Sequence, residues 1–328
     1  MNRTFNWGII GPGKIAHKFA QDLSLLPGAK LHAVASRSLE KAQDFARTYG
    51  APHAFGSYEE IVHCPGLDVV YVATPHSGHF ANALLCLENR IPVLVEKPFT
   101  INAKEAKILI DAAKQHQTFL MEAFWTRFLP TIKTMLDLIE EGRIGRVTGV
   151  KADFGFHSTF DPESRLYNRA LGGGALLDIG VYPVFLALLL FGRPQEIKAL
   201  ATLSPTMVDE EIGILFRYAG GEMAHLHASV RSQTKTEAFI YGETGTIHLH
   251  TRWHEPTSMT ILHPDSRPEY LQWDFHSKGY AYEAVEVMNC LIEGQLESAD
   301  LPLSFSLDLM ETLDAIRTQV GLTYPGHD

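Results

Sequence analysis

Residues 5–16 read F-N-W-G-I-I-G-P-G-K-I-A. An apolar run suited to a buried strand stops at Gly11, and a helical pattern begins directly after it. The spacing from Gly11 is G-x-G-x-x-A, in which Gly11 makes a tight turn and Gly13 lets the backbone approach a pyrophosphate. The helix N-terminus attracts the same anion. The stretch predicts a dinucleotide site that includes Lys14 and Ile15, with a purely structural turn as the alternative.

The first third of the chain continues this pattern. Apolar runs typical of buried strands alternate with helical patterns, and this alternation predicts βαβ units and a parallel sheet. The expected strands are 5–10, 30–36, 69–73, 92–95 and 119–121, and the expected helices are 14–24, 39–49, 77–89 and 103–115. The fold class is therefore α/β, with a Rossmann doubly wound parallel sheet over residues 1–123.

The pattern changes after residue 121. Strands with period-two alternation and tight glycine turns indicate an α+β domain over residues 124–328, with a large open, mostly antiparallel sheet. The expected strands are 147–157, 196–203, 211–218, 223–230, 236–241, 246–250, 259–263 and 270–275, and the expected helices are 130–140, 182–190, 282–293 and 307–320.

Composition excludes several kinds of partner. The chain has 328 residues and a formal charge of −10 without a cluster of basic residues, which argues against nucleic acid and anionic membranes. No apolar run approaches the roughly 20 residues that span a bilayer. Cys64, Cys86 and Cys290 have no metal-like spacing, so we expect reduced thiols, a cytoplasmic location and no metal.

The end of the second expected strand bears on cofactor choice. An NAD-selective site usually carries an acid about 20 residues after the glycine loop, for the ribose 2′-hydroxyl. This chain has Ser36 and Arg37 there, and Ser38 and Lys41 follow. Arg37 could hold a 2′-phosphate, so the sequence favours NADP over NAD. The alternative is that Arg37 is an ordinary exposed loop charge.

Two further strands end in polar residues. Thr74-Pro75-His76-Ser77-Gly78-His79 follows one, and Glu96-Lys97-Pro98 follows another. Ligands bind beyond the carboxyl ends of the strands in an open parallel sheet, so both segments are expected beside the nicotinamide. The two histidines lack further ligands with matching spacing, which disfavours a metal. His79 is expected to pack against the cofactor or to contact substrate.

The second half holds a glycine turn at 172–174, followed by Asp178 and Tyr182. These two residues are four apart and share one face of a helix, in an otherwise apolar stretch. Taken alone, the segment favours a buried tyrosine satisfied by a structural aspartate. Its combination with a dinucleotide domain favours a catalytic pair instead.

Together these motifs carry a resemblance. G-P-G-K-I-A at 11–16, V-E-K-P at 95–98 and D-I-G-V-Y at 178–182 resemble the glucose–fructose oxidoreductase / inositol dehydrogenase / rhizopine catabolism (Gfo/Idh/MocA) family over essentially the whole chain. The segments closest to its trans-1,2-dihydrobenzene-1,2-diol dehydrogenase and NADP-dependent D-xylose dehydrogenase branch are A-S-R at 35–37, M-E-A-F-W-T-R-F at 121–128 and G-G-G-A-L-L-D-I-G-V-Y-P at 172–183.

The resemblance implies an NAD(P)-dependent oxidoreductase that acts on a hydroxyl or carbonyl group of a sugar, polyol or cyclic diol. We expect Tyr182 to be the acid/base and Lys97 its electrostatic partner, because an ammonium lowers a phenol pKa that is otherwise near ~10. Lys97 would also bind the substrate oxygen, and proton transfer by Lys97 itself is the alternative. Asp178 would orient substrate or Lys97.

Further residues are expected around the nicotinamide. Glu96 would contact its ribose, and a cis Lys97–Pro98 bond is conceivable. Trp125 and Arg127 would cover the ring or contact cofactor and substrate. Phe154 or Phe156 would line the substrate pocket.

Two broader expectations complete the analysis. Residues 223–230 alternate, with an apolar face of Ala224, Leu226, Ala228 and Val230 and a semi-polar face of Met223, His225, His227 and Ser229. The resemblance implies a homodimer formed through the open sheet face, with His225 and His227 near the interface. The alternative to an enzyme is a regulator that senses redox state by binding NADP without turnover. Lys97, Asp178 and Tyr182 together favour the enzyme.

Overall fold

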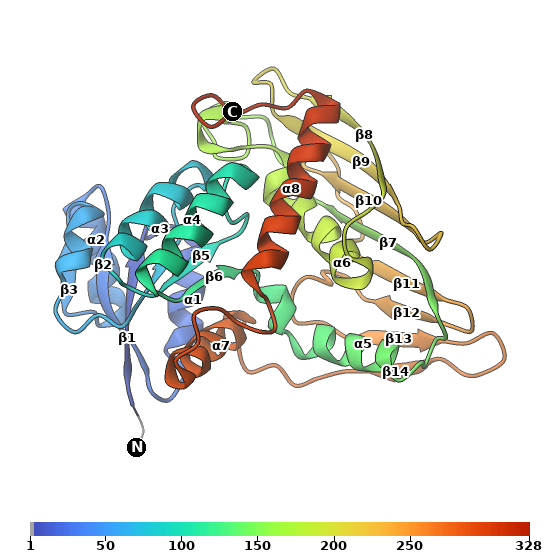
Figure 1. Ribbon diagram of the computed structural model, residues 1–328, viewed down its shortest axis with the longest axis horizontal. Helices are drawn as coiled ribbons and strands as arrows, with labels where there is room; N and C mark the ends of the chain where they lie inside the picture. Colours follow the sequence, from blue (N-terminus) through green and yellow to red (C-terminus); the bar gives the residue numbers. More distant parts are fainter. Residues whose placement is uncertain (1–2) are drawn as a thin grey trace. The chain divides into compact units, whose positions relative to one another are not determined.

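The computed structural model describes residues 3–328, which form two compact units. Unit 1 holds the chain up to Phe128 together with His276–Leu307, and unit 2 holds Leu129–Phe275 and Asp308–Asp328. The division differs from the single boundary expected after residue 123, because a late segment of the chain returns to unit 1. Figure 1 shows the elements of both units along the chain.

Unit 1 is built on a parallel sheet with the strand order β3-β2-β1-β4-β5-β6. This order defines the doubly wound Rossmann fold and confirms the predicted class. The strands are β1 (Phe5–Ile10), β2 (Ala29–Ala35), β3 (His53–Phe55), β4 (Val69–Val72), β5 (Val93–Glu96) and β6 (Leu120–Ala123). The sequence analysis missed β3, because three residues are too few to show a period.

Helices pack against this sheet in unit 1 (Figure 1). They are α1 (Lys14–Leu23), α2 (Leu39–Tyr49), α3 (His79–Glu88) and α4 (Ala103–His116), with 3₁₀ turns η1 (Glu59–His63), η2 (His76–Gly78) and η3 (Trp125–Phe128). Local signals fix several of their ends. The Ser38 side chain caps α2, and Gly50 ends it with a left-handed backbone.

The returning segment carries α7 (Tyr280–Glu293) and is held to unit 1 by a buried acid. The carboxylate of Asp22 accepts hydrogen bonds from the backbone N–H groups of Lys278, Tyr280 and Ala281 at 2.9–3.2 Å. These groups lie at the start of α7, where N–H donors have no partner within the helix. One side chain of α1 therefore caps a helix that lies more than 250 residues further along the chain.

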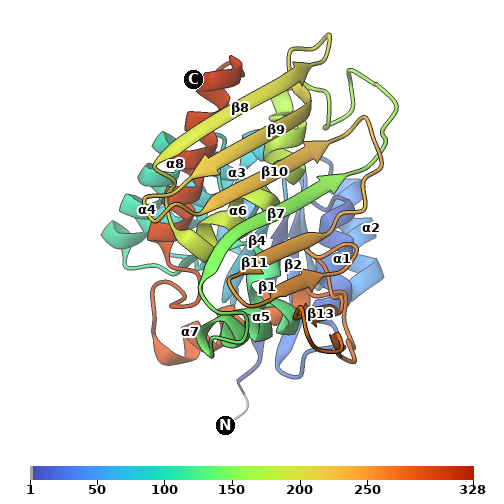
Figure 2. The same cartoon turned by 90° about the vertical axis from the view of Figure 1, so that its right-hand side faces the viewer.

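Unit 2 contains a sheet with the order β14-β13-β12-β11-β7-β10-β9-β8. Its strands are β7 (Val147–Gly155), β8 (Glu196–Leu203), β9 (Asp209–Arg217), β10 (Met223–Ser229), β11 (Ala238–Gly242), β12 (Thr246–Leu249), β13 (Met259–Leu262) and β14 (Glu269–Leu271). All pairs are antiparallel except β7 with β10, which confirms a mostly antiparallel sheet. Figure 2 shows the outer face of this sheet turned toward the viewer.

The inner face of the unit 2 sheet packs against an apolar helical stretch. This stretch comprises the π-helix η5 (Leu176–Gly180) and α6 (Val181–Phe191), and the 3₁₀ turn η4 (Arg169–Leu171) precedes it. The helices α5 (Pro130–Glu140) and α8 (Leu303–Val320) complete the elements, and α8 begins in unit 1 and ends in unit 2. The alternation expected for β10 is confirmed for its buried face of Ala224, Leu226 and Ala228.

Two details of unit 2 differ from the sequence analysis. Residues 169–191 are long and apolar enough to cross a membrane, although no such run was expected. Since 83% of the most apolar window is buried within the protein, the segment behaves as a core helix. Ser229 was placed on the semi-polar face of β10 but is fully buried, because its hydroxyl accepts hydrogen bonds from the N–H groups of Arg231 and Ser232.

Candidate functional site

A pocket of about 260 Å³ lies at the carboxyl ends of the central strands of unit 1. It is lined by Gly11, Pro12, Gly13, Ser36, Arg37, Ser38, Lys41, Tyr58, Ala73, Thr74 and Pro75. Most of these residues directly follow β1, β2 or β4, while Lys41 lies on α2 and Tyr58 follows β3. β1 and β4 lie side by side where the strand order of the sheet reverses. That reversal is where doubly wound folds bind their ligands.

The glycine loop has the geometry that its spacing predicts. Gly11 has a φ of +87°, and a Cβ there would lie 3.0 Å from the backbone carbonyl of Ala73. Gly13 precedes α1 and makes no side-chain cap, and a Cβ on it would meet no described atom within 4 Å. The first glycine is therefore required by the fold, while the second leaves open space in front of the N–H groups of α1.

The far side of the pocket is basic. Arg37 is exposed, and the pocket lining includes Arg37 and Lys41 but no acidic residue. Ser36 is buried, and its hydroxyl accepts a hydrogen bond from the N–H of Ser38. This corner of the pocket presents two cations and no acid, which is the charge pattern that a 2′-phosphate requires.

Thr74 gives an independent sign that the pocket accepts a polar ligand. Its Oγ1 atom is buried and has no hydrogen-bond partner among residues 3–328. Buried hydroxyl groups in native proteins are normally paired, and the exceptions call for a water, an ion or a ligand. The open space at Gly13, the cations and this orphaned hydroxyl together fit a dinucleotide.

Lys97 lies directly after β5 and close to two buried acids, Glu96 and Glu122. Glu96 accepts a hydrogen bond from the Tyr71 hydroxyl and another, at 3.2 Å, from the backbone N–H of Lys97. Burial raises the pKa of Glu122 on the neighbouring β6 to about 7, and the Lys97 ammonium opposes that rise. The Lys97–Pro98 bond is cis. The Lys97 side chain is half-buried beside these two acids, and its predicted contact with a substrate oxygen stays a prediction.

His79 differs from its predicted role. The ring has no exposed surface, and its two nitrogens lie 2.8 Å and 3.0 Å from the carbonyl oxygens of Pro98 and Thr74. Burial lowers its pKa to about 4, so a neutral ring donates to one carbonyl at a time. A buried ring that contacts both strand-end loops positions them and has no surface left for cofactor or substrate. His76 packs edge-on against it at 5.7 Å.

Trp125 and Arg127 connect η3 to the returning segment of unit 1. Trp125 is buried and stacks on Tyr280 with a centroid separation of 4.3 Å. Arg127 donates from Nε to the carbonyl oxygen of Asp300 at 2.7 Å and pairs with its carboxylate at 3.1 Å. These contacts are structural, and the predicted contacts with cofactor and substrate remain predictions.

In unit 2 the glycine turn determines where Asp178 lies. Gly174 has a φ of +116°, and a Cβ there would lie 2.2 Å from Oδ1 of Asp209. Asp209 is fully buried and accepts a hydrogen bond from the N–H of Leu176 at 2.6 Å. Asp178 in the following π-helix pairs with both terminal nitrogens of Arg165, at 2.7 Å and 3.3 Å. A bidentate arginine thus orients this carboxylate.

Tyr182 lies in a cluster of rings in unit 2. It is 5% exposed, and its ring centroid lies 5.6 Å from Phe154 and 4.9 Å from His254. Phe154 and His254 stack on each other at 4.0 Å. Glu255 lies within ion-pairing distance of His254. Burial alone would raise the pKa of Glu255, but its contacts with His254 and Arg252 outweigh burial and lower the pKa to about 2.

The structure thus groups the predicted residues in part. Gly11, Gly13, Ser36, Arg37, Thr74 and Pro75 line one pocket. Lys14, Ile15, His76, Glu96, Lys97, Trp125 and Arg127 lie outside its lining, so their contacts with cofactor stay predictions. Sequence reasoning missed Tyr58, Arg165, Asp209 and His254. His254 stands in W-H-E at 253–255, beside an aromatic residue and an acid, but this short stretch alone predicts no site.

Models of two family domains match the chain. The oxidoreductase family with an NAD-binding Rossmann fold matches residues 5–124, and the GFO/IDH/MocA C-terminal domain matches residues 132–248. Trans-1,2-dihydrobenzene-1,2-diol dehydrogenase of Danio rerio is 38% identical, covering 97% of each chain. The enzyme of that name from Homo sapiens is 34% identical, covering 97% of this chain and 98% of its own.

Solved structures share the fold. A 3-ketoreductase from Actinomadura kijaniata, in complex with NADP and TDP-benzene, has a TM-score of 0.88 and 25% identity over 97% of this chain and 98% of its own. Levoglucosan dehydrogenase, in complex with NADH and L-sorbose, has a TM-score of 0.88 and 21% identity over 97% of each chain, which shows the fold alone. None of these relatives supports the alternative of a regulator without turnover. The chain belongs to the GFO/IDH/MocA family of oxidoreductases, whose N-terminal domain is an NAD-binding Rossmann fold.

Proposed function

We propose that the protein is an NADP-preferring dehydrogenase or reductase that acts on a CH–OH group of a cyclic diol or sugar. The basic corner of the cofactor pocket carries the NADP preference. Arg37 and Lys41 line it without a nearby described acid, where an NAD-selective site would place a carboxylate. A 2′-phosphate would find two cations there and the N–H groups at the start of α2 behind them.

Lys97 and Tyr182 are the residues we assign to the chemical step. When bound, the nicotinamide provides the acceptor for the carbinol hydride. The Tyr182 hydroxyl takes the substrate hydroxyl proton, and Lys97 donates a hydrogen bond to the same oxygen and stabilises its developing charge. Proton transfer by Lys97 is the alternative. Solved forms of the 3-ketoreductase include variants of one lysine and of one tyrosine, the same two residue types.

The substrate class rests on the rings around Tyr182 and on the names of the relatives. Phe154 and His254 offer a flat wall next to the tyrosine, which suits a ring-shaped substrate with an apolar face. Asp178, oriented by Arg165, offers an acceptor for a second hydroxyl. An acceptor and a flat wall together favour a vicinal diol on a ring over an open-chain alcohol.

A substrate panel tests the proposal. Steady-state turnover is measured with trans-diols on six-membered rings, pentoses, hexoses and open-chain diols, each with NADP and with NAD. We expect the highest kcat/KM for a cyclic vicinal diol or a pyranose with NADP. A chain that binds NADP but turns over no member of the panel would instead behave as a cofactor-binding regulator.

We further propose a homodimer formed through the outer face of the unit 2 sheet. Leu215 pairs with His225 on the neighbouring strand, and His225 pairs with Lys151 on the next, so all three point outward. Leu200 and Leu215 are 84% and 43% exposed. In the described residues no helix covers this face (Figure 2). Apolar side chains on a broad flat face are what a second copy would bury.

Sedimentation equilibrium at micromolar concentration tests the dimer. We expect twice the 36.5 kDa of one chain. His225→Glu, alone or combined with His227→Glu, is expected to shift the mass toward one chain, because a buried carboxylate would have no partner. The exposed Glu163→Gln is the control. A native mass of one chain would reject the dimer, and an unaffected variant would place the interface elsewhere.

A cytoplasmic location remains a proposal. Its support is that Cys64, Cys86 and Cys290 are unbridged and few in number, which suits a reducing compartment.

A further inference from the structure

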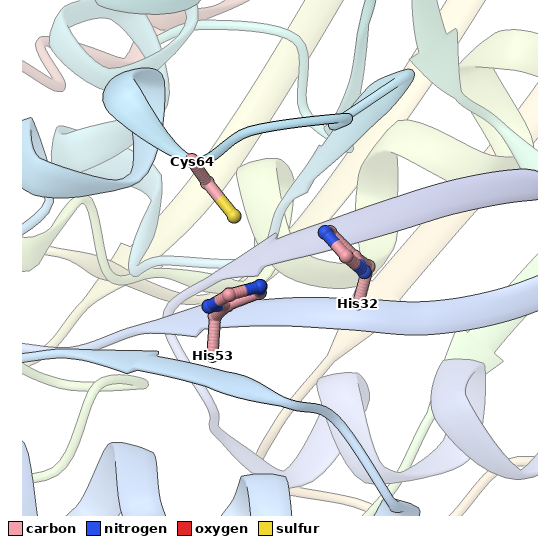
Figure 3. A group of neighbouring side chains, drawn as sticks. All are labelled: His32, His53 and Cys64. Carbon is pink, nitrogen blue, oxygen red and sulfur yellow. The ribbon is translucent and has the colours of Figure 1, made fainter.

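Three potential metal ligands meet in unit 1 away from the cofactor pocket. His32 lies on β2, His53 begins β3, and Cys64 directly follows η1. One nitrogen of each imidazole and the Cys64 sulfur all lie within 4.8 Å of one another. Figure 3 shows the three side chains converging from three backbone segments. We propose that His32, His53 and Cys64 bind zinc or a similar borderline divalent cation.

The donor set selects the class of cation. A thiolate and two imidazoles are the ligands that zinc prefers, whereas magnesium and calcium take oxygen ligands. Three protein ligands leave a fourth tetrahedral position for water. The sequence analysis expected no metal because no two cysteines had suitable spacing. The three ligands come from two strands and a loop, so they do not have the short, regular spacing in the sequence that marks a metal motif.

The hydrogen bonding of His32 supports the proposal. Its Nε2 lies 2.9 Å from the carbonyl oxygen of Pro65, so Nε2 carries the hydrogen and donates it. Nδ1 then keeps its lone pair, and this atom is buried with no hydrogen-bond partner among residues 3–328. In metal-binding imidazoles a carbonyl that accepts a hydrogen from one nitrogen leaves the other nitrogen as the ligand. His32 would therefore bind the cation through Nδ1 once its ring has turned toward His53 and Cys64.

The distances fit a metal-free site that closes on binding. With zinc bonds of about 2.0–2.3 Å, donor atoms in a tetrahedral centre lie roughly 3.3–3.7 Å apart. The donors here must therefore approach by about 1 Å from separations of up to 4.8 Å. The two rings already meet edge to face with centroids 4.8 Å apart. Rotation about one bond of the cysteine and two bonds of each histidine provides movement of this size.

A bound cation would link segments that lead into the cofactor pocket. β2 contains His32 and ends at Ala35, directly before Ser36, and η1 directly follows Tyr58. Ser36 and Tyr58 both line the pocket. The cation would join the edge strand β3 and the loop at Cys64 to β2. We therefore expect zinc to raise the thermal stability of the chain, as any ligand of the native state does.

Cobalt titration of the native full-length chain tests the site, because cobalt replaces zinc and reports thiolate ligation by a near-ultraviolet charge-transfer band. We expect a saturable band at one equivalent that zinc displaces. Cys64→Ser should abolish the band, and His53→Ala should weaken cobalt binding at least about tenfold. The matched controls are His63→Ala, an exposed histidine next to Cys64, and Cys290→Ser, and both should keep the band.

Several results would overturn the proposal. The native chain could give no charge-transfer band with cobalt. The band could also survive in Cys64→Ser, or be lost in the two control variants as it is in Cys64→Ser. If the variants fail to fold, zinc calorimetry on the native chain in two buffers of different ionisation enthalpy decides. Binding to a thiol releases a proton and makes the observed heat depend on the buffer. A buffer-independent heat, or none, contradicts a thiolate ligand.

Discussion

The cofactor pocket of unit 1 and the tyrosine cluster of unit 2 are built in opposite ways. The pocket is shaped mainly by backbone: a left-handed Gly11, an open Gly13 and the N-termini of two helices. The cluster is shaped by side chains, since Tyr182 packs against Phe154 and His254. A backbone site tolerates changes in distant side chains, whereas a packed site depends on each neighbour.

This difference separates binding from chemistry in the mutational behaviour that we expect. Changes in the pocket should alter cofactor affinity and leave the intrinsic chemical step intact. Changes at Lys97, directly after β5, and at Tyr182, shortly after η5, should slow the chemical step and leave cofactor affinity intact. Each prediction below would sharpen this separation or break it.

The largest effect is expected at Lys97. Lys97→Ala should reduce kcat by about a hundredfold or more, because one donor to a developing oxyanion contributes that much. NADP affinity, measured by calorimetry, should stay within a few-fold of the native value. The control is Lys107→Ala on α4, where the lysine is exposed and pairs with Asp111. Unchanged turnover would remove Lys97 from the mechanism.

Tyr182→Phe should lower kcat by a similar or slightly smaller factor. The ring and its packing against Phe154 and His254 remain, while the proton-transferring hydroxyl is lost. The pH profile of kcat/KM should lose the limb that belongs to this group. Tyr218→Phe is the control, since it removes another buried hydroxyl of unit 2. If the Tyr182 variant keeps both rate and pH profile, the acid/base role passes to Lys97.

Two glycine substitutions contrast the regions directly. Gly174→Ala should destabilise the fold by about 2 kcal/mol or more, because its φ of +116° and the contact with Asp209 leave no room for Cβ. Gly13→Ala should leave stability almost unchanged, since its Cβ meets no described atom within 4 Å, and should weaken NADP binding. Thermal denaturation with and without NADP measures both. Equal loss of stability in the two variants would contradict the contrast.

Arg37→Ala tests the basic corner of the pocket. A charge-assisted contact contributes ~1.5–3 kcal/mol, so NADP affinity should fall roughly ten- to a hundredfold. NAD affinity should change little, because NAD lacks the 2′-phosphate. Arg47→Ala on α2, an exposed arginine paired with Asp44, is the control. Equal losses for the two cofactors would show that Arg37 does not recognise the phosphate.

The smallest effect is a pH dependence at Glu122. Burial raises the folded pKa of Glu122 from 4.5 to about 7, so the folded state holds this proton more tightly than the unfolded state does. The stability that the bound proton provides is fully present below the unfolded pKa. It is lost as pH rises through the folded pKa. Glu122→Gln cannot titrate. The stability of the native chain relative to this variant should therefore fall by about 1 kcal/mol between pH 6 and pH 8. A difference that does not change with pH would contradict the raised pKa.

The two regions also differ in how far the sequence predicts them. The glycine loop and the polar ends of β4 and β5 are contiguous motifs, so Gly11, Arg37 and Thr74 could be assigned to one site. Asp178 is held by Arg165 and by the turn that Asp209 binds, and Tyr182 packs against His254. Folding brings these residues together from separate segments of the chain. A single sequence holds no periodic signal for such contacts.

The same limit applies to the division into units. After Met121 the pattern changes from alternating strands and helices to strands of period two, which indicates the end of one domain. This change cannot show that a later segment of the chain returns to that domain. The bond between Asp22 and the start of α7 makes residues 276–307 part of unit 1. A helix cap across so many residues leaves no local pattern. Full burial of His79 was likewise invisible, since a histidine after a strand fits a ligand and a loop anchor equally well.

The most direct test of the proposed chemistry follows an isotope. The best substrate of the panel is prepared with deuterium on its carbinol carbon and oxidised by the native chain with NADP. We predict that the reduced nicotinamide carries the deuterium at C4 in one stereochemical position. Over the same time, Tyr182→Phe should form this labelled product up to about a hundredfold more slowly, in line with its lower kcat. Reduced cofactor without deuterium, or no reduced cofactor with any substrate despite NADP binding, would contradict hydride transfer from a CH–OH group.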